Sequence, residues 1–439
     1  MPWWEAASLM IGGILALMLL GVPVAFAFLA MNIFGVVLFM GGMAGVDQLV
    51  DNASAALTTF TLVPIPMFVL MGELFFHTGL AVRVFDALDK CLGRLPGRLS
   101  YMTVGGGTIF ATLSGSSLAN TAMLGSLMVP DMERRGYKKP MIMGPILATG
   151  GLAMIIPPST LAVLLGSLAR VDVGALLIAG LVPGLILAVL YVAVIRIQLW
   201  RDPSAAPGYD TARATPGEIA RALLINVMPM GLVIFCVVGF ILFGWATPTE
   251  SAAIGVLAVL VLAALYGRLS WAALTRSLRG ALAVTAMMFL IILGSSTFSQ
   301  ILAFSGATSG LLAFATGFDI SPYAMIVVLL LVLIVLGMFM DQLSMMLLTL
   351  PIFMPLITTL GFDPIWFGVI MLLALELSLT TPPFGLLLFV MLGVAPKGTT
   401  LGEVARAAAP YIACSLILIA LLTVFPGIAL FLPSAMGPP

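Results

Sequence analysis

A set of prolines and one glycine recurs along this chain at a constant spacing of 225 residues, inside apolar sequence. The first set is Pro23, Pro130, Gly136, Pro157 and Pro158, and the second is Pro248, Pro355, Gly361, Pro382 and Pro383. Two of the matches are Pro-Pro pairs, in MIIPPST (154–160) and LTTPPFG (379–385). Proline removes an amide donor and clashes with the preceding turn, so each pair predicts an interrupted helix. Interruptions at matching places in two halves of a membrane protein are typical of a transporter's binding site.

The composition indicates a membrane protein. Of the 439 residues, 62% are hydrophobic and 8% are charged, whereas soluble domains carry about 25% charged residues. Apolar runs of about twenty residues, long enough to cross a bilayer as a helix, recur along the chain. The 18 basic and 18 acidic residues balance, so no nucleic-acid partner is expected. We expect an all-α polytopic protein embedded in the lipid bilayer, and a retained first span at its start rather than a signal peptide.

The basic residues indicate which connections face the cytoplasm, because an excess of Lys and Arg in short loops marks that side. The basic segment 83–98 corresponds, at the 225-residue spacing, to 308–323, which has no Lys or Arg. In reverse, the basic segment 268–279 corresponds to 43–54, which holds only acidic charges. Equivalent connections therefore fall on opposite faces, and we predict two repeats of inverted topology. Arg170 is the one basic residue that this scheme places on the outer side.

The same pattern sets the expected boundaries. Repeat 1 covers 1–200, a polar cytoplasmic connector covers 201–222, and repeat 2 covers 223–439. Each repeat is expected to hold a re-entrant helical hairpin and a Pro-Pro-broken helix: hairpin 99–133 with broken helix 140–170, and hairpin 322–358 with broken helix 364–395. Further spans are predicted at 5–21, 23–42, 55–76, 173–195, 223–243, 247–266, 280–305 and 404–432. Both chain termini then lie on the outer side.

The first hairpin turns at a run of small and polar residues, ATLSGSSLANTA (111–122). Small residues let two half-helices approach closely. Hydroxyl and amide oxygens near the middle of the bilayer come from Ser114, Ser116, Ser117, Asn120 and Thr121. Such hard ligands suit Na⁺ better than a soft metal. A single Ser or Thr is commonly only a helix contact, but five polar groups at one tip favour a binding site.

The second hairpin turns at GMFMDQLSMMLL (337–348), where Asp341 occupies the position equivalent to Ser116. An ionisable residue inside the membrane is energetically expensive and is a functional candidate by default. The alternative is an interhelical salt bridge, for which no nearby predicted span offers a Lys or Arg. Asp341 could ligate a cation directly, hold it through neighbours, or hydrogen-bond the substrate.

The two breaks complete the expected site. Each leaves carbonyl groups before the Pro-Pro pair, which suit cations, and a helix N-terminus after it, which suits an anionic group. Further side-chain oxygens, or backbone carbonyls that a ligand can approach, are offered near the breaks by Thr149, Gly150, Gly151, Ser378, Thr380 and Thr381. Ser159 and Thr160 could either cap the helix that restarts after Pro158 or contact the substrate.

The other ionisable residues give weaker patterns. Glu73, Glu250 and Glu376 could exchange protons, pair with polar neighbours or stay neutral, and Glu376 lies about one turn before the second break. His77, the only histidine, is expected at the membrane interface beside a basic loop. The three cysteines lack the spacing of a disulfide framework or a zinc site. No HExxH or GxSxG motif occurs, so we do not expect an enzyme.

Four segments together resemble the large membrane subunit of tripartite ATP-independent periplasmic (TRAP) transporters. They are SGSSLANTAMLGSLMVPDMERRGY (114–137), IIPPS (155–159), LGMFMDQLSMMLLTLPIFMPL (336–356) and TTPPFG (380–385), and the similarity extends over essentially the whole chain. The resemblance implies sodium-driven uptake of a small organic acid, such as a C4-dicarboxylate or a sugar acid, across a bacterial inner membrane, with both termini periplasmic. It also implies a small membrane subunit of about four helices, a periplasmic substrate-binding protein, and an elevator mechanism.

The resemblance also assigns residues to roles. Na⁺ would be the coupling ion, held in one site by the first tip with the 149–157 break and in another by Asp341 with the 380–382 break. The expected sodium ligands are Ser114, Ser116, Asn120, Thr149, Gly150, Pro157, Asp341, Thr380, Thr381 and Pro382. The expected substrate contacts are Ser116, Ser117, Ser159, Thr160, Asp341 and Gly385. Leu118 and Asn120 depart from the run of tiny residues that the family commonly has at this tip.

Two other classes of transport protein stay open at this point. One is a stand-alone inverted-repeat anion or sodium–proton antiporter that needs no binding protein. The scarcity of Lys and Arg in the predicted spans argues against it, because such a protein must neutralise its anionic substrate alone. The other is a channel, but repeated tips that enter from opposite sides favour alternating access over an open pore.

Overall fold

The computed structural model describes residues 1–93, 95–208, 215–317, 320–337, 340–382 and 385–436. Within these ranges the chain folds into helices without a strand. Eight helical segments in the described part are long and apolar enough to cross a membrane, the longest being α16 (Trp271–Phe304). The predicted all-α, multi-pass membrane fold is confirmed.

The helices have the following bounds. In the first half they are α1 (Trp3–Leu19), α2 (Val24–Phe39), α3 (Met43–Thr58), α4 (Pro64–His77), α5 (Leu80–Leu92), α6 (Arg98–Ser114), α7 (Ser117–Arg134), α8 (Lys139–Ile155), α9 (Thr160–Ala169), α10 (Val173–Ala179) and α11 (Leu181–Arg201). In the second half they are α12 (Pro216–Ala222), α13 (Met228–Ile234), α14 (Phe240–Leu242), α15 (Pro248–Leu265), α16, α17 (Ala307–Thr316), α18 (Pro322–Leu336), α19 (Gln342–Thr359), α20 (Pro364–Thr380), α21 (Leu386–Val394), α22 (Leu401–Val424) and α23 (Gly427–Ala435).

Helices recur at the same spacing as the prolines. Helices α7 and α19 begin and end 225 residues apart, and so do α8 and α20. The helix pairs α6–α7 and α18–α19 occupy the segments predicted as hairpins, and α8–α9 and α20–α21 occupy those predicted as broken helices. Pro383 lies outside the described residues. The division into repeats and their inverted orientation in a membrane stay predictions.

Several predicted connections are helical instead. The segment 43–54 lies within α3, residues 83–92 of the basic segment 83–98 lie within α5, and α17 occupies part of 308–323. In α5 the buried residues Leu80, Ala81, Val84 and Phe85 form one apolar stripe, which Arg83 between them obscured in the sequence. These helices are short or amphipathic, so a search for twenty-residue apolar runs misses them.

Three predicted spans have different ends. Residues 55–58 belong to α3, and the span predicted at 55–76 is confined to α4 and the short 3₁₀ turn Phe60–Leu62 before it, because Pro64 starts a new helix. The predicted span 404–432 is divided at Pro426 into α22 and α23. Helix α16 starts at Trp271, nine residues before its predicted start at 280.

The connector predicted at 201–222 is partly helical. A 3₁₀ turn covers Pro203–Ala205, and α12 begins after Thr215, whose side chain and that of Glu218 cap it reciprocally. Lys138 pairs with Asp202 across this end of the molecule, and this hydrogen bond, with one from Ser204, holds the pKa of the Asp202 carboxyl below its usual value. These contacts fasten the start of α8 to the end of α11.

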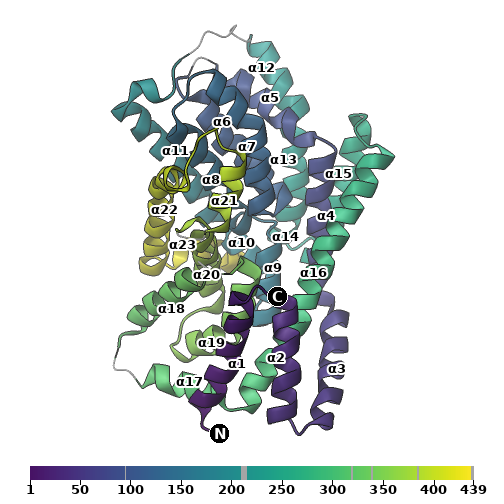
Figure 1. Cartoon of the computed structure of the whole chain (residues 1–439). Helices are drawn as coiled ribbons and strands as arrows, with labels where there is room; N and C mark the ends of the chain where they lie inside the picture. Colours follow the sequence, from purple (N-terminus) through teal and green to yellow (C-terminus); the bar gives the residue numbers. More distant parts are fainter. Residues whose placement is uncertain (94, 209–214, 318–319, 338–339, 383–384, 437–439) are drawn as a thin grey trace.

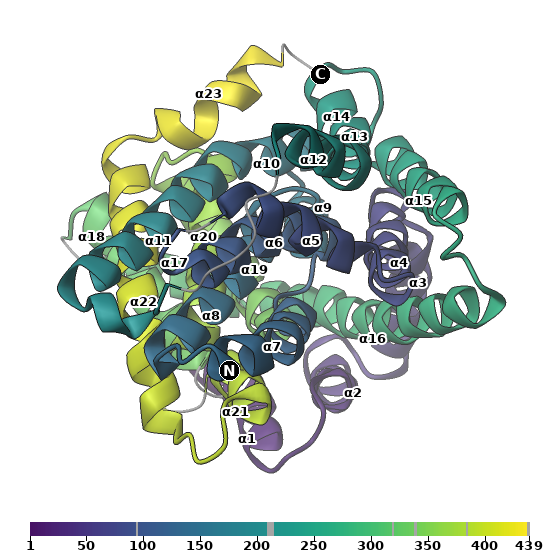
Figure 2. The ribbon, with the colours of Figure 1, turned by 90° about the horizontal axis from the view of Figure 1, so that it is seen from above.

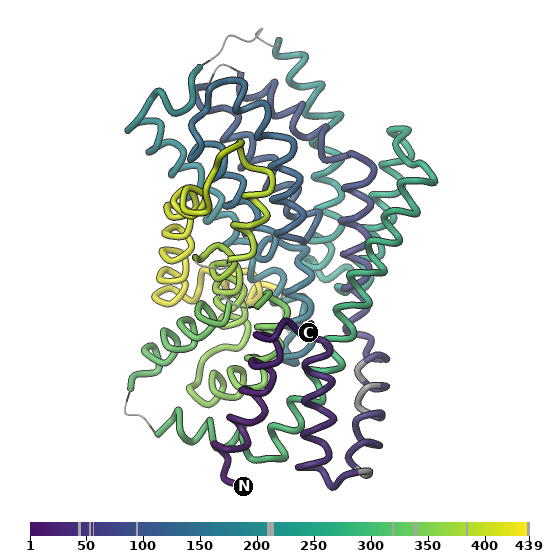
Figure 3. Tube along the Cα trace, in the orientation of Figure 1, coloured from purple at the N-terminus to yellow at the C-terminus, as the bar shows by residue number. Residues whose placement is uncertain are grey.

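The two helix pairs predicted as hairpins lie towards opposite ends of the molecule. Figure 1 shows α6 and α7 in the upper half, near α5 and α12, and α18 and α19 in the lower half, near α1 and α17. The Cα trace in Figure 3 shows the same separation. Seen from above, α16 lies beside α2, α3 and α4, while α6, α9 and α19 lie near the centre (Figure 2). Helices α4 and α16 pack against each other, and both contact the central group, α4 through α6 and α9, α16 through α19.

Candidate functional site

Both hairpin tips line one cavity of about 490 Å³. The residues from the first tip are Ser114, Gly115, Ser116, Ser117, Leu118 and Ala119, and those from the second are Asp341, Gln342 and Leu343. Thr160 and Leu161 at the start of α9, Leu386 at the start of α21, and residues of α4, α6, α8, α16 and α20 complete the lining. The structure thus brings together five of the predicted site residues: Ser114, Ser116, Ser117, Thr160 and Asp341.

The first tip is a tight turn closed by hydroxyl groups. Gly115 has φ 60°, a left-handed conformation that glycine adopts without strain. Ser116 caps α7, since its side chain accepts a hydrogen bond from the Ala119 amide at 3.3 Å. The Thr160 hydroxyl donates to the Gly115 carbonyl at 3.4 Å. The turn is therefore held both by its own cap and by the helix that restarts after the first break.

Behind this tip, α7 and α8 enclose unpaired oxygens. The Asn120 side-chain amide donates to the Thr149 carbonyl at 2.7 Å, and Asn120 is fully buried. The remaining oxygen of Asn120, Oδ1, and the Thr121 hydroxyl are buried without a hydrogen-bond partner in the described structure. A Cβ at Gly150 would lie 2.6 Å from the Thr121 oxygen, so the two helices approach here as closely as glycine allows.

These oxygens fit a bound sodium ion. Leaving a buried oxygen without a partner costs free energy that a cation would recover. The donor set consists of amide, hydroxyl and carbonyl oxygens, which are hard ligands. Among the described residues no group of three His, Cys, Asp or Glu side chains could hold a transition metal. Asn120 and Thr149 lie behind the tip, outside the lining of the 490 Å³ cavity.

At the second tip Asp341 caps α19. Its carboxylate accepts hydrogen bonds from the Leu343 amide at 3.0 Å, from the Ser344 amide at 3.3 Å, and from the Ser344 hydroxyl. The amides at a helix N-terminus stabilise the negative charge. Met338 and Phe339, just before Asp341, lie outside the described residues. Asp341 is only partly buried and lines the cavity, so capping leaves it facing the same space as the first tip.

Around the second break, the predicted hydroxyl groups bond locally. Thr380 and Thr381 both donate to the Leu377 carbonyl, at 2.9 Å and 2.7 Å. Ser159, at the first break, caps α9 by accepting from the Ala162 amide at 3.2 Å. None of these three, nor Pro157, Pro382 or Gly385, is among the described residues that line the tip cavity. Their predicted roles as ligands stay predictions.

One acidic residue, Glu376, joins the two tips, although its sequence pattern was weaker than that of Asp341. The Glu376 carboxylate is buried, and its Oε2 accepts hydrogen bonds from Ser117 of the first tip at 3.0 Å and from Gln342 of the second at 3.2 Å. Its other oxygen has no partner in the described structure. A Cβ at Gly151 would lie 2.8 Å from the Glu376 side chain, so α8 covers it closely. Its place about one turn before a Pro-Pro break was the only sequence signal for this role.

Glu73 and His77 form a polar pair at the α4 side of the tip cavity. His77 Nε2 lies 3.2 Å from Glu73 Oε2, and both residues line the cavity. His77 was expected at an interface beside a basic loop, and α5, which carries Arg83 and Lys90, follows it directly. The pair therefore borders the cavity on the side of α4 that leads to α5 and its basic residues.

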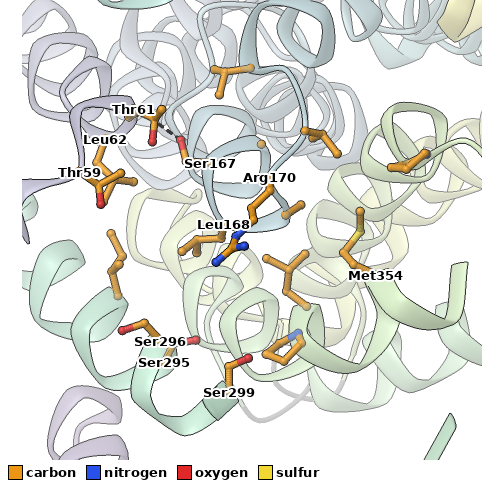
Figure 4. Close-up of a pocket in the computed structure, with 18 of the residues that line it drawn as sticks. Thr59, Thr61, Leu62, Ser167, Leu168, Arg170, Ser295, Ser296, Ser299 and Met354 are labelled. Carbon is orange, nitrogen blue, oxygen red and sulfur yellow. Dashed lines mark hydrogen bonds between the residues drawn. The ribbon is translucent and has the colours of Figure 1, made fainter. Parts of the chain in front are cut away.

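A second and larger cavity lies between the end of α9 and the middle of α16. Its volume is about 1200 Å³, and Figure 4 shows side chains of both helices directed into it. Its lining includes Ser167, Arg170, Ser295, Ser296, Ser299 and Met354. Residues of α3, of the α3–α4 connection, of α19 and at the starts of α10 and α20 complete it. Arg170, the exception in the charge pattern of the sequence, therefore faces a cavity.

Paired helices and interrupted helices around a shared cavity are typical of membrane transporters. The crystal structure of the YdaH transporter of Alcanivorax borkumensis has the same fold, with a TM-score of 0.61 over 90% of each chain at 16% sequence identity. The family model "Tripartite ATP-independent periplasmic transporter, DctM component" matches residues 11–428, and this chain belongs to that family. It is a multi-pass inner-membrane transport subunit, as predicted, and not an enzyme.

Named relatives are similar along almost the whole chain. The C4-dicarboxylate TRAP transporter large permease protein DctM of Pseudomonas aeruginosa is 33% identical over 86% of this chain and 87% of its own length. The 2,3-diketo-L-gulonate TRAP transporter large permease protein YiaN of Escherichia coli is 29% identical over 96% of each chain. The resemblance inferred from the four sequence segments is confirmed.

Proposed function

We propose that this chain is the large membrane subunit of a sodium-driven importer of a small organic acid. The observation that carries the proposal is the shared cavity between the two tips, with unpartnered buried oxygens of Asn120 and Thr121 directly behind one of them. The named relatives carry a C4-dicarboxylate and a keto-sugar acid in their names. A carboxylate is therefore the substrate class that we assign to the tip cavity.

In this proposal the first sodium ion is held by the Asn120 side-chain oxygen together with oxygens of the first tip and of the Thr149 region. A second ion is held by Asp341 and carbonyl groups of the second break. When bound, the ions supply positive charge beside the cavity, where no described Lys or Arg is present. Ser116, Ser117 and Thr160 then orient the carboxylate by hydrogen bonds.

Alternating access would proceed by an elevator motion. The hairpins pack on the broken helices, with α6 and α7 against α8 and with α18 and α19 against α20. Helices α2, α4, α15 and α16 form a separate packed group beside them. The first group would slide against the second and carry the tip cavity across the membrane. The family description names a tripartite system, so a small membrane subunit and a periplasmic binding protein are the proposed partners.

Reconstitution tests sodium coupling. The chain and its small membrane subunit are placed in liposomes, the purified binding protein is added outside, and radiolabelled organic acids found by thermal-shift screening of that protein are supplied. Uptake should require high external sodium and should fall to background when choline replaces it. Uptake that is unchanged in choline eliminates sodium coupling. Uptake at full rate without the binding protein would instead favour the stand-alone antiporter.

A further inference from the structure

The 1200 Å³ cavity has a single formal charge. Among its described lining residues Arg170 alone is ionisable. The Arg170 guanidinium forms no ion pair and no hydrogen bond within the part of the chain that the structure describes, and the residue is exposed. Figure 4 shows it directed into the space between the end of α9 and the serines of α16. An unpaired cation in a concave space raises the local concentration of anions.

Arg170 has a left-handed backbone conformation, which indicates a functional role for its side chain. Arg170 follows the last residue of α9 with φ 56° and ψ 38°, and it is the only non-glycine residue with a positive φ in the described chain. Its own amide and that of Val171 both donate to the Gly166 carbonyl, which closes the helix end. Glycine is preferred at such a position because a Cβ adds strain. An arginine kept there despite the strain points to a functional side chain.

The nearby acidic residues are engaged elsewhere. The Asp172 side chain accepts a hydrogen bond from the Ala175 amide and caps α10. The Asp363 side chain accepts from the Ile365 and Trp366 amides and caps α20, whose first residue, Pro364, touches the cavity rim. Both carboxylates therefore stabilise helix N-termini, and neither forms an ion pair with Arg170 within the described structure.

The rest of the lining carries polar groups among apolar side chains. Hydroxyl groups come from four separate places: Thr59 and Thr61 before α4, Ser167 in α9, Thr358 in α19, and Ser295, Ser296 and Ser299 in α16. Ser167 and Ser296 donate to backbone carbonyls, Thr61 and Leu293, at 3.0 Å each. Ser299 has no hydrogen bond that the structure records. A carboxylate beside Arg170 could thus keep water around it and gain one further donor.

We propose that Arg170 and Ser299 form a carboxylate-binding site in this cavity, separate from the tip cavity. Resting on the proposed function, this site would hold the substrate's carboxylate on its way from the binding protein to the tips. Arginine presents two parallel N–H groups that match the two oxygens of a carboxylate. The exposed position and the single cation make the binding weak. Weak binding suits a residue that must release the anion again.

Thiol protection tests the site without transport. Ser299→Cys is made after replacement of Cys91, Cys236 and Cys414, and the purified protein in detergent is labelled with a neutral thiol reagent. Succinate at 50 mM should slow labelling roughly twofold or more compared with chloride at equal ionic strength, a fold-change that partial occupancy of a weak site gives. The same assay is run with Arg170→Gln, with Arg170→Lys, and with Arg406→Gln as a control at the far end of the chain.

The outcomes separate the alternatives. The site is supported if protection is lost in Arg170→Gln, retained at least in part in Arg170→Lys, and unchanged in Arg406→Gln. The site is overturned if succinate protects Arg170→Gln as well as the protein with Arg170, or if it does not protect the protein with Arg170 at all. In the reconstituted system Arg170→Gln should raise the half-saturating substrate concentration more than it lowers the maximal rate. If the unaltered protein transports nothing, the proposed function fails, while the labelling assay still decides the role of Arg170.

Discussion

Ser117 and Glu376 are joined by a hydrogen bond of 3.0 Å although they are 259 residues apart in the chain. The carboxylate oxygen that accepts it also accepts from Gln342 of the other hairpin tip at 3.2 Å. One buried acid therefore fixes both tips relative to each other and to α20. Because no described basic residue lines the small space around it, this contact depends on hydrogen bonding and not on an ion pair.

Removing the Glu376 side chain should destabilise the protein. Glu376→Ala leaves two donors unsatisfied and opens a cavity, for an expected loss of about 2–4 kcal/mol in unfolding free energy. Glu376→Gln keeps an acceptor oxygen in place and should lose less than about 1 kcal/mol. Unfolding in detergent micelles measures both, with Glu133→Ala, an exposed residue of α7, as control. Equal losses in the two Glu376 variants would contradict the proposed bridging role.

Asp341 combines a structural and a proposed ionic role, which two substitutions separate. Asn caps a helix about as well as Asp, so Asp341→Asn should keep stability, whereas Asp341→Ala should lose about 1 kcal/mol. Both variants should abolish sodium-driven uptake because both remove the negative charge. Normal uptake by Asp341→Asn at unchanged expression would remove the charge of Asp341 from the mechanism.

The local features of the site follow from the sequence. The Pro-Pro pairs predicted the helix ends at Ile155 and Thr380, and the small polar run predicted the turn at Gly115. Both depend on residues that are neighbours in the chain, where backbone sterics decide. Asp341 was recognised because a charge is expensive in an apolar run.

The contacts between distant residues could not be predicted in this way. In the sequence Glu376 is an isolated acid in an apolar helix, as Glu73 is. Only the packing of α7, α19 and α20 brings Ser117 and Gln342 to it. Helix α5 was missed because charged residues such as Arg83 alternate with its apolar stripe in the sequence. Arg170 contradicted the charge pattern, and only the folded chain shows that it faces a cavity. Periodicity indicates which face of a helix is apolar, but not which helix it meets.

Asn120 should determine sodium affinity. Asn120→Ala removes the unpartnered Oδ1 and the amide bond to the Thr149 carbonyl, so we expect the sodium concentration needed for half-maximal effect to rise by about tenfold, or 1.4 kcal/mol. Sodium that binds the folded state raises the unfolding temperature, and this rise is the measurement. Ser126→Ala, an exposed position on the same helix, is the control. An identical sodium response in Asn120→Ala would rule out Oδ1 as a ligand.

The inverted orientation of the halves can be tested by labelling. Lys90 in α5 and Ala315 in α17 are 225 residues apart and occupy equivalent short helices. Single cysteines at the two positions, in a background without native cysteines, should react with a membrane-impermeant reagent from opposite faces. Lys90→Cys should react only after the membrane is opened, because its surroundings are basic. Labelling of both positions in intact cells would refute the inverted topology.

A methyl group at Gly72 should hinder the proposed elevator motion. Gly72 of α4 faces the first tip so closely that a Cβ would lie 2.6 Å from the Ser114 carbonyl oxygen. In a packed interior the Ser114 backbone can move away only at a cost in free energy. Alanine itself stabilises a helix by about 1 kcal/mol relative to glycine. Gly72→Ala should therefore fold but disfavour the state in which the tip rests against α4. Uptake should slow several-fold, whereas Gly12→Ala, which meets open space, should keep its rate. A Gly72→Ala variant that transports at the original rate would show that this contact is not part of the cycle, and the sliding surface would then have to lie elsewhere along α4 and α16.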